Sequence, residues 1–427
     1  MSGMMSREEA SGLDRAGARS NAGHRGRIVT AMALAAVAGA GIWTILDTRR
    51  SDLRRTGNPS LLTQERPFPA EGRYPSDPYI GALACEECHP GPFALQTRSG
   101  HSRTLRSAGS LSLARTLDGI RIADPEHPRV TWGFRYHEGR LQVSHTEQGR
   151  VEEAIVEYAF GSGRHATTFV NLLDPEQPTI LEHRLTSYAK GRSLGLTPGQ
   201  DRMPRPPGGS PIGRMFTADE ALKCFGCHTT QTSGGTDRAI DEATMIPNVS
   251  CERCHGPGRA HVEAARRGAP ESELTLPFGP GRYTAEALLT FCGTCHRHPS
   301  GSHPGQIRPD NPMLARFQPV GILQSRCYRE SGGTLSCVTC HDPHARPSTD
   351  RASYIATCVS CHSLSHSGAS SRRSETHRQR LDPPIVIGVP CPVQPRGDCI
   401  GCHMPRVDAG QNVLFADHWI RVRRPGE

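Results

Sequence analysis

The sequence is short of the residues that usually build a protein core. Of its 427 residues only 35% are hydrophobic and 5% are aromatic, whereas 45 are Gly and 35 are Pro. A chain of this length normally buries a larger share of Leu, Ile, Val and Phe. The composition therefore excludes an ordinary large domain, and it leaves either an irregular chain or a chain wrapped around apolar material that is not its own.

Lysine and long apolar runs are also scarce. Lys190 and Lys223 are the only lysines among the 50 basic residues. The single uncharged stretch long enough to span a bilayer is 28–46. After a 27-residue leader this stretch favours an uncleaved transmembrane anchor, with a cleaved signal peptide as the alternative. The Pro-rich residues 47–80 then predict an extended linker.

Cysteine, by contrast, is abundant and regularly placed. Fourteen of the 16 cysteines form seven Cys-x-x-Cys pairs, and each pair is followed directly by His. This pattern is the attachment signature of c-type haem and predicts seven covalently bound haems with iron. The cofactor-binding residues are Cys85, Cys88, His89, Cys224, Cys227, His228, Cys251, Cys254, His255, Cys292, Cys295, His296, Cys337, Cys340, His341, Cys358, Cys361, His362, Cys399, Cys402 and His403.

The spacing has a chemical reason. Two Cys three positions apart lie on one side of a helical turn and can bind the two vinyl groups of one porphyrin, while the following His ligates the iron. Zinc sites with four thiolates use such pairs two at a time, so seven pairs have the wrong parity. A disulfide framework has no use for the His. Haem attachment is therefore strongly favoured over both alternatives.

Seven haems would also account for the composition and the charge. Each porphyrin is a large apolar body, so a chain wrapped around several needs fewer apolar side chains. The formal net charge is +8, and each ferric haem with two propionates adds roughly one negative charge. The holoprotein should be near neutral, and nucleic acid is not expected as a partner.

The motif spacing sets the expected organisation. The motif histidines are separated by 139 residues and then by 27, 41, 45, 21 and 41, which is too dense for separate cores after the first gap. We expect a mainly α and irregular multihaem fold, with short helices around stacked haems and a small β-rich insertion. The expected segments are a cytoplasmic leader 1–27, the anchor 28–46, the linker 47–80, a first haem segment 81–110, the insertion 111–215 and a six-haem unit 216–427.

Alternating apolar residues predict strands in the long first gap. Val130, Trp132, Phe134 and Tyr136 alternate with polar residues, and a turn at Glu138 and Gly139 leads into a second alternating run, as in a β-hairpin. Further strands are expected over 151–160, 167–173 and 179–188. Residues 284–291, leading into Cys292, predict a helix.

Several strings resemble the multihaem c-type cytochromes related to the tetrahaem cytochrome c of nitrifying bacteria. They are Ser99 to Ser102, Cys251 to Gly258 with His261, Ser336 to His344, Cys402 to Pro405 and Asp417 to Ile420. The resemblance covers roughly residues 80–420 and is weak in the insertion. It implies an extracytoplasmic electron carrier whose haems are mostly ligated by two histidines, with an occasional five-coordinate haem.

Each iron needs a second axial ligand unless it binds a substrate. Besides the seven motif histidines, 13 histidines lie downstream of the anchor. His101, His261, His344 and His418 match the family pattern and are the first distal candidates. Because His344 follows His341 by three residues, we expect it to ligate a neighbouring haem. His165, His183, His366 and His377 form a second set. His127, His137, His145, His298 and His303 are expected at the surface.

Two classes of function remain open. In the first, all haems are closed and the protein carries electrons between a quinol-linked membrane donor and a periplasmic acceptor. In the second, one open haem, expected at His89 or His296, acts on a small nitrogen or sulfur compound. Neither lysine lies in a Cys-x-x-Cys-Lys motif of the kind that the pentahaem nitrite reductases carry, and no Tyr stands out as a catalytic group. The sequence therefore favours the carrier, on the periplasmic side of the inner membrane, or secreted to the periplasm if residues 28–46 are cleaved.

The two cysteines outside the motifs are Cys327 and Cys391. In an oxidising compartment we expect them to pair with each other rather than to form a reactive thiol.

Overall fold

The computed structural model describes residues 78–189, 193–201, 210–234, 238–278, 283–362, 397–411 and 413–423. All of them belong to the unit Asn58–Glu427. The expected anchor 28–46 and most of the linker 47–80 lie outside the described residues. Among the described residues, no helix combines the length and the apolar character needed to cross a membrane.

A four-stranded antiparallel sheet forms where the alternating pattern predicts it. Its order is β2-β3-β4-β5, and its central hairpin turns at Glu138 and Gly139, both with positive φ (48° and 79°). Two successive residues in this conformation make the tight turn that matches the twist of a hairpin. The strands are β2 (Arg121–Ala123), β3 (Val130–His137), β4 (Arg140–Glu147) and β5 (Arg150–Val156).

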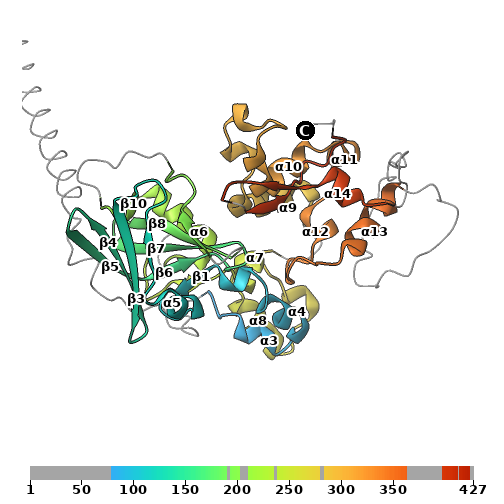
Figure 1. Ribbon diagram of the computed structural model, residues 1–427. Coiled ribbons are helices and arrows are strands. Elements are labelled where there is room, and N and C mark those ends of the chain that lie inside the picture. Colours follow the sequence, from blue (N-terminus) through green and yellow to red (C-terminus); the bar gives the residue numbers. More distant parts are fainter. Residues whose placement is uncertain are drawn as a thin grey trace, which may run out of the picture. The chain divides into compact units, whose positions relative to one another are not determined.

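A second, six-stranded antiparallel sheet follows (Figure 1). It has the order β1-β6-β7-β8-β10, with β9 also paired to β8. Its strands are β1 (Leu105–Ser107), β6 (Tyr158–Phe160), β7 (Ala166–Asp174), β8 (Thr179–Tyr188), β9 (Ser193–Leu196) and β10 (Gly213–Thr217). The strands predicted over 151–160, 167–173 and 179–188 are confirmed. The β structure is larger than the small insertion expected, because β1 lies within the predicted first haem segment.

The inner faces of the two sheets form one apolar core. Trp132 and Leu141 from the four-stranded sheet pack in the same cluster as Phe169 and Leu181 from the six-stranded sheet, and all four are at most 1% exposed. Helix α5 (Ser112–Leu117) adds its buried face to this cluster. This part of the chain therefore supplies its own core, as the strand alternation predicts.

A second apolar cluster joins the six-stranded sheet to the helix that carries the second motif. Phe225 of α6 (Asp219–His228) is 0% exposed, and its ring meets those of Tyr158 and Phe160 at centroid distances of 5.4 and 5.2 Å. These edge-to-face contacts are favourable for aromatic rings. They fix the helix, and with it His228, against the sheet.

The other motifs lie on short helices, as expected. Thr284 caps α9 by accepting a hydrogen bond from the Ala287 N–H, which confirms the helix predicted over 284–291. The motif helices are α3 (Leu83–Glu86), α7 (Cys251–His255), α9 (Ala285–His296), α12 (Cys337–Cys340), α13 (Arg351–His362) and α14 (Cys399–His403). The remaining helices include α4 (Pro90–Gln96), η1 (His101–Arg103), α8 (Arg259–Arg266), η2 (Glu271–Glu273), η3 (Pro299–Gly301), η4 (Pro304–Gln306), η5 (Pro312–Arg316), α10 (Gln318–Gln324) and α11 (Arg326–Glu330).

Two short antiparallel ribbons complete the described structure. One pairs β11 (Thr229–Gln231) with β12 (Ile246–Pro247) and links the second motif to the third. The other pairs β13 (Arg406–Asp408) with β14 (Leu414–Ala416) and leads to His418. Both ribbons begin directly after or shortly after a motif His, so they place the chain that follows the attachment point.

Candidate haem sites

All seven motifs lie within the described residues, and most end a short helix with the His at or just beyond its last turn. No disulfide joins any two of the 15 described cysteines. Within the described residues no group of three or more His, Cys, Asp or Glu side chains is arranged to hold a metal ion. Each motif presents two thiols and one imidazole within five residues, which is the donor set that covalent haem requires.

Four motif histidines face a second histidine from a distant part of the chain. The rings of His89 and His261 have centroids 6.4 Å apart, and those of His255 and His344 are 6.1 Å apart. The other two pairs are His101 with His296, at 6.2 Å, and His341 with His418, at 6.3 Å. The four first distal candidates are thus each brought beside a motif His, and His344 lies beside a motif other than its own.

This separation fits a metal ion held between two imidazoles. A metal–imidazole nitrogen bond is about 2.0–2.1 Å. With roughly 1.1 Å from each nitrogen to its ring centre, two rings on one iron would have centroids about 6.4 Å apart. The observed distances of 6.1 to 6.4 Å match this value. The residues present therefore fit an iron with two axial histidines.

The hydrogen bonds of these rings leave the correct nitrogen free. Nδ1 of His255 lies 3.1 Å from the Phe278 carbonyl oxygen, and Nδ1 of His418 lies 2.9 Å from that of Ala416. Nδ1 of His344 lies 3.0 Å from the Asp342 carboxylate. A hydrogen bond at Nδ1 fixes the ring and directs Nε2 toward a metal.

Burial keeps several of these imidazoles neutral, which is the form that binds metals. Burial lowers the pKa of His101, and it also lowers the pKa of His255 and His341. For His418 burial lowers the pKa to about 4.

The first and fourth motifs therefore each have a second histidine beside the motif histidine. We expected an open site at His89 or His296, but His261 and His101 lie beside them. Sequence spacing could not reveal this because the partners are far away along the chain. His296, for example, pairs with a histidine that precedes the entire β-rich region.

The second motif is arranged differently. The His228 ring stacks on Phe160 with a centroid distance of 4.5 Å, and its Nδ1 lies 2.8 Å from the Thr104 carbonyl oxygen. Burial lowers the pKa of His228. In the described part of the chain no second histidine ring contacts it. Neither Phe160 nor Thr104 was indicated by the sequence, because each belongs to the strand region that precedes the motif.

The sixth and seventh motifs border residues 363–396, which lie outside the described residues together with the candidates His366 and His377. His362 ends α13 directly before that segment. Nδ1 of His403 lies 3.0 Å from the Arg421 carbonyl oxygen, so its Nε2 is also left for a metal.

Two other candidates lie away from the described motif histidines. His165 packs against Phe415, with ring centroids 4.9 Å apart. His183 is 2% exposed within the six-stranded sheet, where its Nε2 lies 2.6 Å from the Asn171 side-chain oxygen. Since Nε2 is already used, His183 is a core residue. His145, which we expected at the surface, is also buried and meets the Trp132 ring edge to face at 5.0 Å.

His183 gives a prediction for acid stability. Burial lowers its pKa from 6.5 to about 3, so between these values the unfolded chain binds a proton that the folded chain does not. Stability should therefore be full above pH 6.5 and fall toward pH 3, with a slope of up to about 1.4 kcal/mol per pH unit from this residue. Thermal unfolding of the wild type and of His183→Gln at several pH values would measure it. An equally steep acid loss in both proteins would contradict this origin.

Thiols of neighbouring motifs come together in a defined order. The thiols of Cys85 and Cys251, of Cys227 and Cys295, and of Cys292 and Cys337 lie close enough to shift one another's pKa. Cys254 interacts electrostatically with Cys292, and Cys358 interacts with Cys340 and with Cys399. The motifs therefore follow one another in space as first, third, fourth, fifth, sixth and seventh, with the second beside the fourth.

Cys327 lies on α11, near the fifth and sixth motifs, and burial raises the pKa of its thiol. The pairing expected with Cys391 lies outside the described residues.

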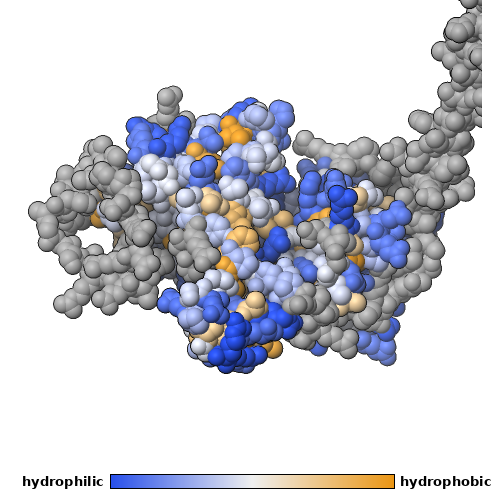
Figure 2. Space-filling view, turned by 180° about the vertical axis from the view of Figure 1, so that it is seen from behind, coloured by the Kyte–Doolittle hydropathy of each residue, from blue (hydrophilic) through white to orange (hydrophobic). Residues whose placement is uncertain are grey.

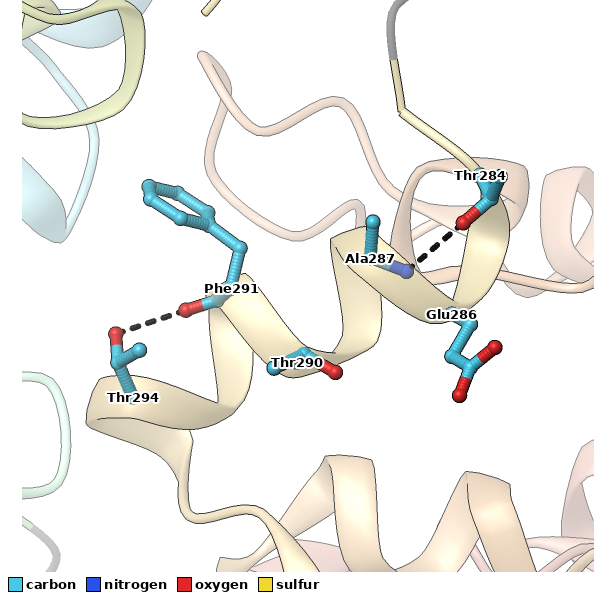
Figure 3. Close-up of a pocket in the computed structure, with 6 residues that line it drawn as sticks. All are labelled: Thr284, Glu286, Ala287, Thr290, Phe291 and Thr294. Atoms are coloured by element: carbon cyan, nitrogen blue, oxygen red, sulfur yellow. Dashed lines mark hydrogen bonds between the residues drawn. The ribbon is translucent and has the colours of Figure 1, made fainter.

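A hollow of about 490 Å³ runs along α9 (Figure 3). It is lined by Thr284, Glu286, Ala287, Thr290, Phe291 and Thr294. The Thr294 carbonyl oxygen lies 3.7 Å from the Cys227 sulfur, so the hollow borders the attachment point of the second motif.

Apolar side chains are exposed next to motifs. Figure 2 shows hydrophobic patches among the polar surface of the described chain. Leu83 and Leu95, on the helices before and after the first motif, are 61% and 46% exposed. Phe278, whose carbonyl accepts from His255, is 39% exposed. A porphyrin lying on these side chains would remove them from water.

The chain is similar to multihaem cytochromes. The family described as "Cytochrome c554 and c-prime" matches residues 212–256, which contain the second and third motifs. "Dissimilatory sulfite reductase MccA" of Wolinella succinogenes is 22% identical over 329 residues, 64% of this chain and 42% of that protein. The chain thus spans less than half the length of this curated relative. The solved structure "Crystal Structure of Outer Cell Wall Cytochrome OcwA" has a TM-score of 0.42 and 14% identity, covering 82% of this chain and 80% of that one.

Proposed function

We propose that this chain holds seven haems and carries electrons along them. Its family match and its curated relative support a multihaem c-type cytochrome with covalently bound haem. The observation that carries the proposal is the set of four histidine pairs at 6.1 to 6.4 Å. Two axial histidines close an iron to substrates and leave it able to change oxidation state. Four closed sites in one chain suit electron transfer.

The order of the attachment points supports a path between the ends of the described chain. Electron transfer slows steeply with distance, so a carrier needs its redox groups side by side. The thiols of successive sites in the series from the first to the seventh motif are neighbours, with the second motif as a branch at the fourth. The chain's own residues would hold each group through the two motif cysteines and the motif histidine.

Location and partners are part of the same proposal. Covalent haem is attached outside the cytoplasm, so we place residues 47–427 on the periplasmic side of the inner membrane, anchored by residues 28–46. A quinol-linked membrane donor and a periplasmic acceptor would then supply and remove electrons. The test is expression of the full chain with and without residues 1–46, followed by membrane fractionation. Recovery of the full chain in the soluble fraction would argue against the anchor.

A second function is favoured by the arrangement at the second motif. His228 has Phe160 and not a histidine beside its ring within the described residues, and the hollow along α9 borders Cys227. The curated relative is named as a sulfite reductase. An open iron at this position would bind a small anion such as sulfite or nitrite, or neutral hydroxylamine, and the neighbouring closed sites would deliver the electrons.

One experiment separates the two functions. We would count haems by mass under denaturing conditions and record electron paramagnetic resonance of the oxidised protein with and without sulfite, nitrite or hydroxylamine. Seven haems with only low-spin signals that do not change when a ligand is added would establish a carrier. A high-spin signal that shifts with a ligand would establish an open site and favour the reductase. A protein without covalent haem would refute both.

A further inference from the structure

Glu252 is a buried carboxylate between the two cysteines of the third motif. It is 3% exposed. Its Oε1 accepts hydrogen bonds from the backbone N–H groups of Ile80, at 3.0 Å, and Gly258, at 2.9 Å. Its Oε2 accepts one from the N–H of Gly81, at 2.8 Å. Hydrogen bonds to a charged acceptor are about twice as strong as neutral ones, so this carboxylate is firmly held.

These bonds tie together two parts of the chain that are 171 residues apart. The segment Ile80 to Gly81 ends four residues before Cys85, and Gly81 has a φ of 90°, a conformation that favours glycine. Arg259 reinforces the tie, because its side chain donates to the Tyr79 carbonyl oxygen at 2.9 Å. The entry to the first motif is therefore fastened to the third motif through Glu252.

The attachment points of these two motifs lie within the reach of the same charge. The Cys85 thiol lies beside the thiol of Cys251, the residue next to Glu252. That contact, burial and the charge of Glu252 all raise the pKa of Cys85. A negative charge in a poorly solvated place favours the more positive ferric state of any iron held nearby.

We propose that Glu252 is a positioning residue that fastens the first attachment point to the third, and that its charge lowers the reduction potentials of the two haems bound there. The inference rests on the proposed function, since it needs haem at both motifs. It goes further because it names a side chain of this protein that determines which haems of the series have the lowest reduction potentials. The feature that supports it is the burial of the carboxylate with three backbone donors and its place beside both thiols.

The test is an optical redox titration of the haem-loaded full chain and of Glu252→Gln. We expect two haems of the variant to be reduced about tenfold more readily, a shift of about 59 mV for one electron. The matched control is Glu86→Gln, because Glu86 occupies the same position in the first motif but is exposed to solvent. Its titration should stay within a factor of two of the wild type. A Glu252→Gln curve that superimposes on the wild type would overturn the inference.

A second variant separates the charge from the fastening. Glu252→Asp keeps the charge but is too short to reach Ile80 and Gly81. We expect near-wild-type potentials and faster chymotrypsin cleavage after Tyr79. Shifted potentials or unchanged cleavage in Glu252→Asp would count against the inference. This test can still be made if Glu252→Gln does not assemble. The mass of the wild-type protein shows whether haem is covalently bound, and its absence would refute the proposed function. Unchanged potentials in haem-loaded Glu252→Gln would refute only the role of Glu252.

Discussion

On the proposed ligation, replacement of His418 by alanine is expected to convert one closed haem into an open one. The His418 ring lies 6.3 Å from that of His341, and no other histidine ring of the described chain contacts His341. Removing the imidazole leaves the iron with a free coordination position. One haem equivalent should change from low-spin to high-spin in the paramagnetic resonance spectrum, and cyanide should restore a low-spin signal.

The control for this experiment is His137→Ala, because the His137 side chain is 74% exposed on the hairpin and far along the chain from any motif. It should leave the spectrum unchanged. If His418→Ala retains the full low-spin intensity, His418 is not an axial ligand. The geometric argument for the other three pairs would then lose its support as well.

Replacement of Asp124 by alanine should cost about 3–5 kcal/mol of folding stability, because it removes the fully buried partner of Arg184 and leaves that cation only the partly exposed Glu126. The Asp124 side chain is 0% exposed and the Arg184 side chain 7%, and the Arg184 Nε lies 2.7 Å from Asp124 Oδ2. The same oxygen accepts from the Trp132 indole at 3.0 Å. Calorimetry of the wild type and the variant measures the change.

Two control variants test whether loss of the ion pair causes this loss of stability. Glu153→Gln changes an exposed carboxylate on β5 and should stay within about 0.5 kcal/mol of the wild type. Asp124→Asn keeps one acceptor oxygen and should fall between the wild type and Asp124→Ala. A stability of Asp124→Ala within 1 kcal/mol of the wild type would contradict the role of the ion pair.

The Asp124 site also depends on pH. Although burial acts in the opposite direction, hydrogen bonds from Arg184 and Trp132 hold the pKa of Asp124 well below its ordinary value. The unfolded chain therefore takes up a proton at a higher pH than the folded chain does. The stability from this site is present above about pH 4 and is lost as the pH falls further. It adds to the loss from His183, which begins at a higher pH.

The sequence predicted local features well. Each of the seven motifs needs only five consecutive residues, so they are visible in the printed chain. The strands around Trp132 and Phe134 follow from alternation over eight residues, and α9 includes the helical stretch predicted over 284–291. These signals act over one or two turns or one strand, where spacing along the chain determines spacing in the structure.

Contacts between distant segments could not be predicted in the same way. The histidines chosen by resemblance do lie beside motif histidines, but which one faces which motif depends on how the helices pack. His145 and His183 are polar residues on inward-facing positions of strands, and only a partner such as Asn171 shows why they are buried. Phe160 beside His228 belongs to a strand whose pairing brings it to the second motif. No short-range pattern contains that information.

The long reach of the histidine pairs has a consequence for biogenesis. His89 meets a partner 172 residues further along the chain, and His101 meets one 195 residues further along. During export the first motif emerges well before the third and the fourth. On the proposed ligation, the first haem must wait with an empty coordination position until the later segments arrive, so the maturation machinery handles an incomplete site that the finished protein no longer has.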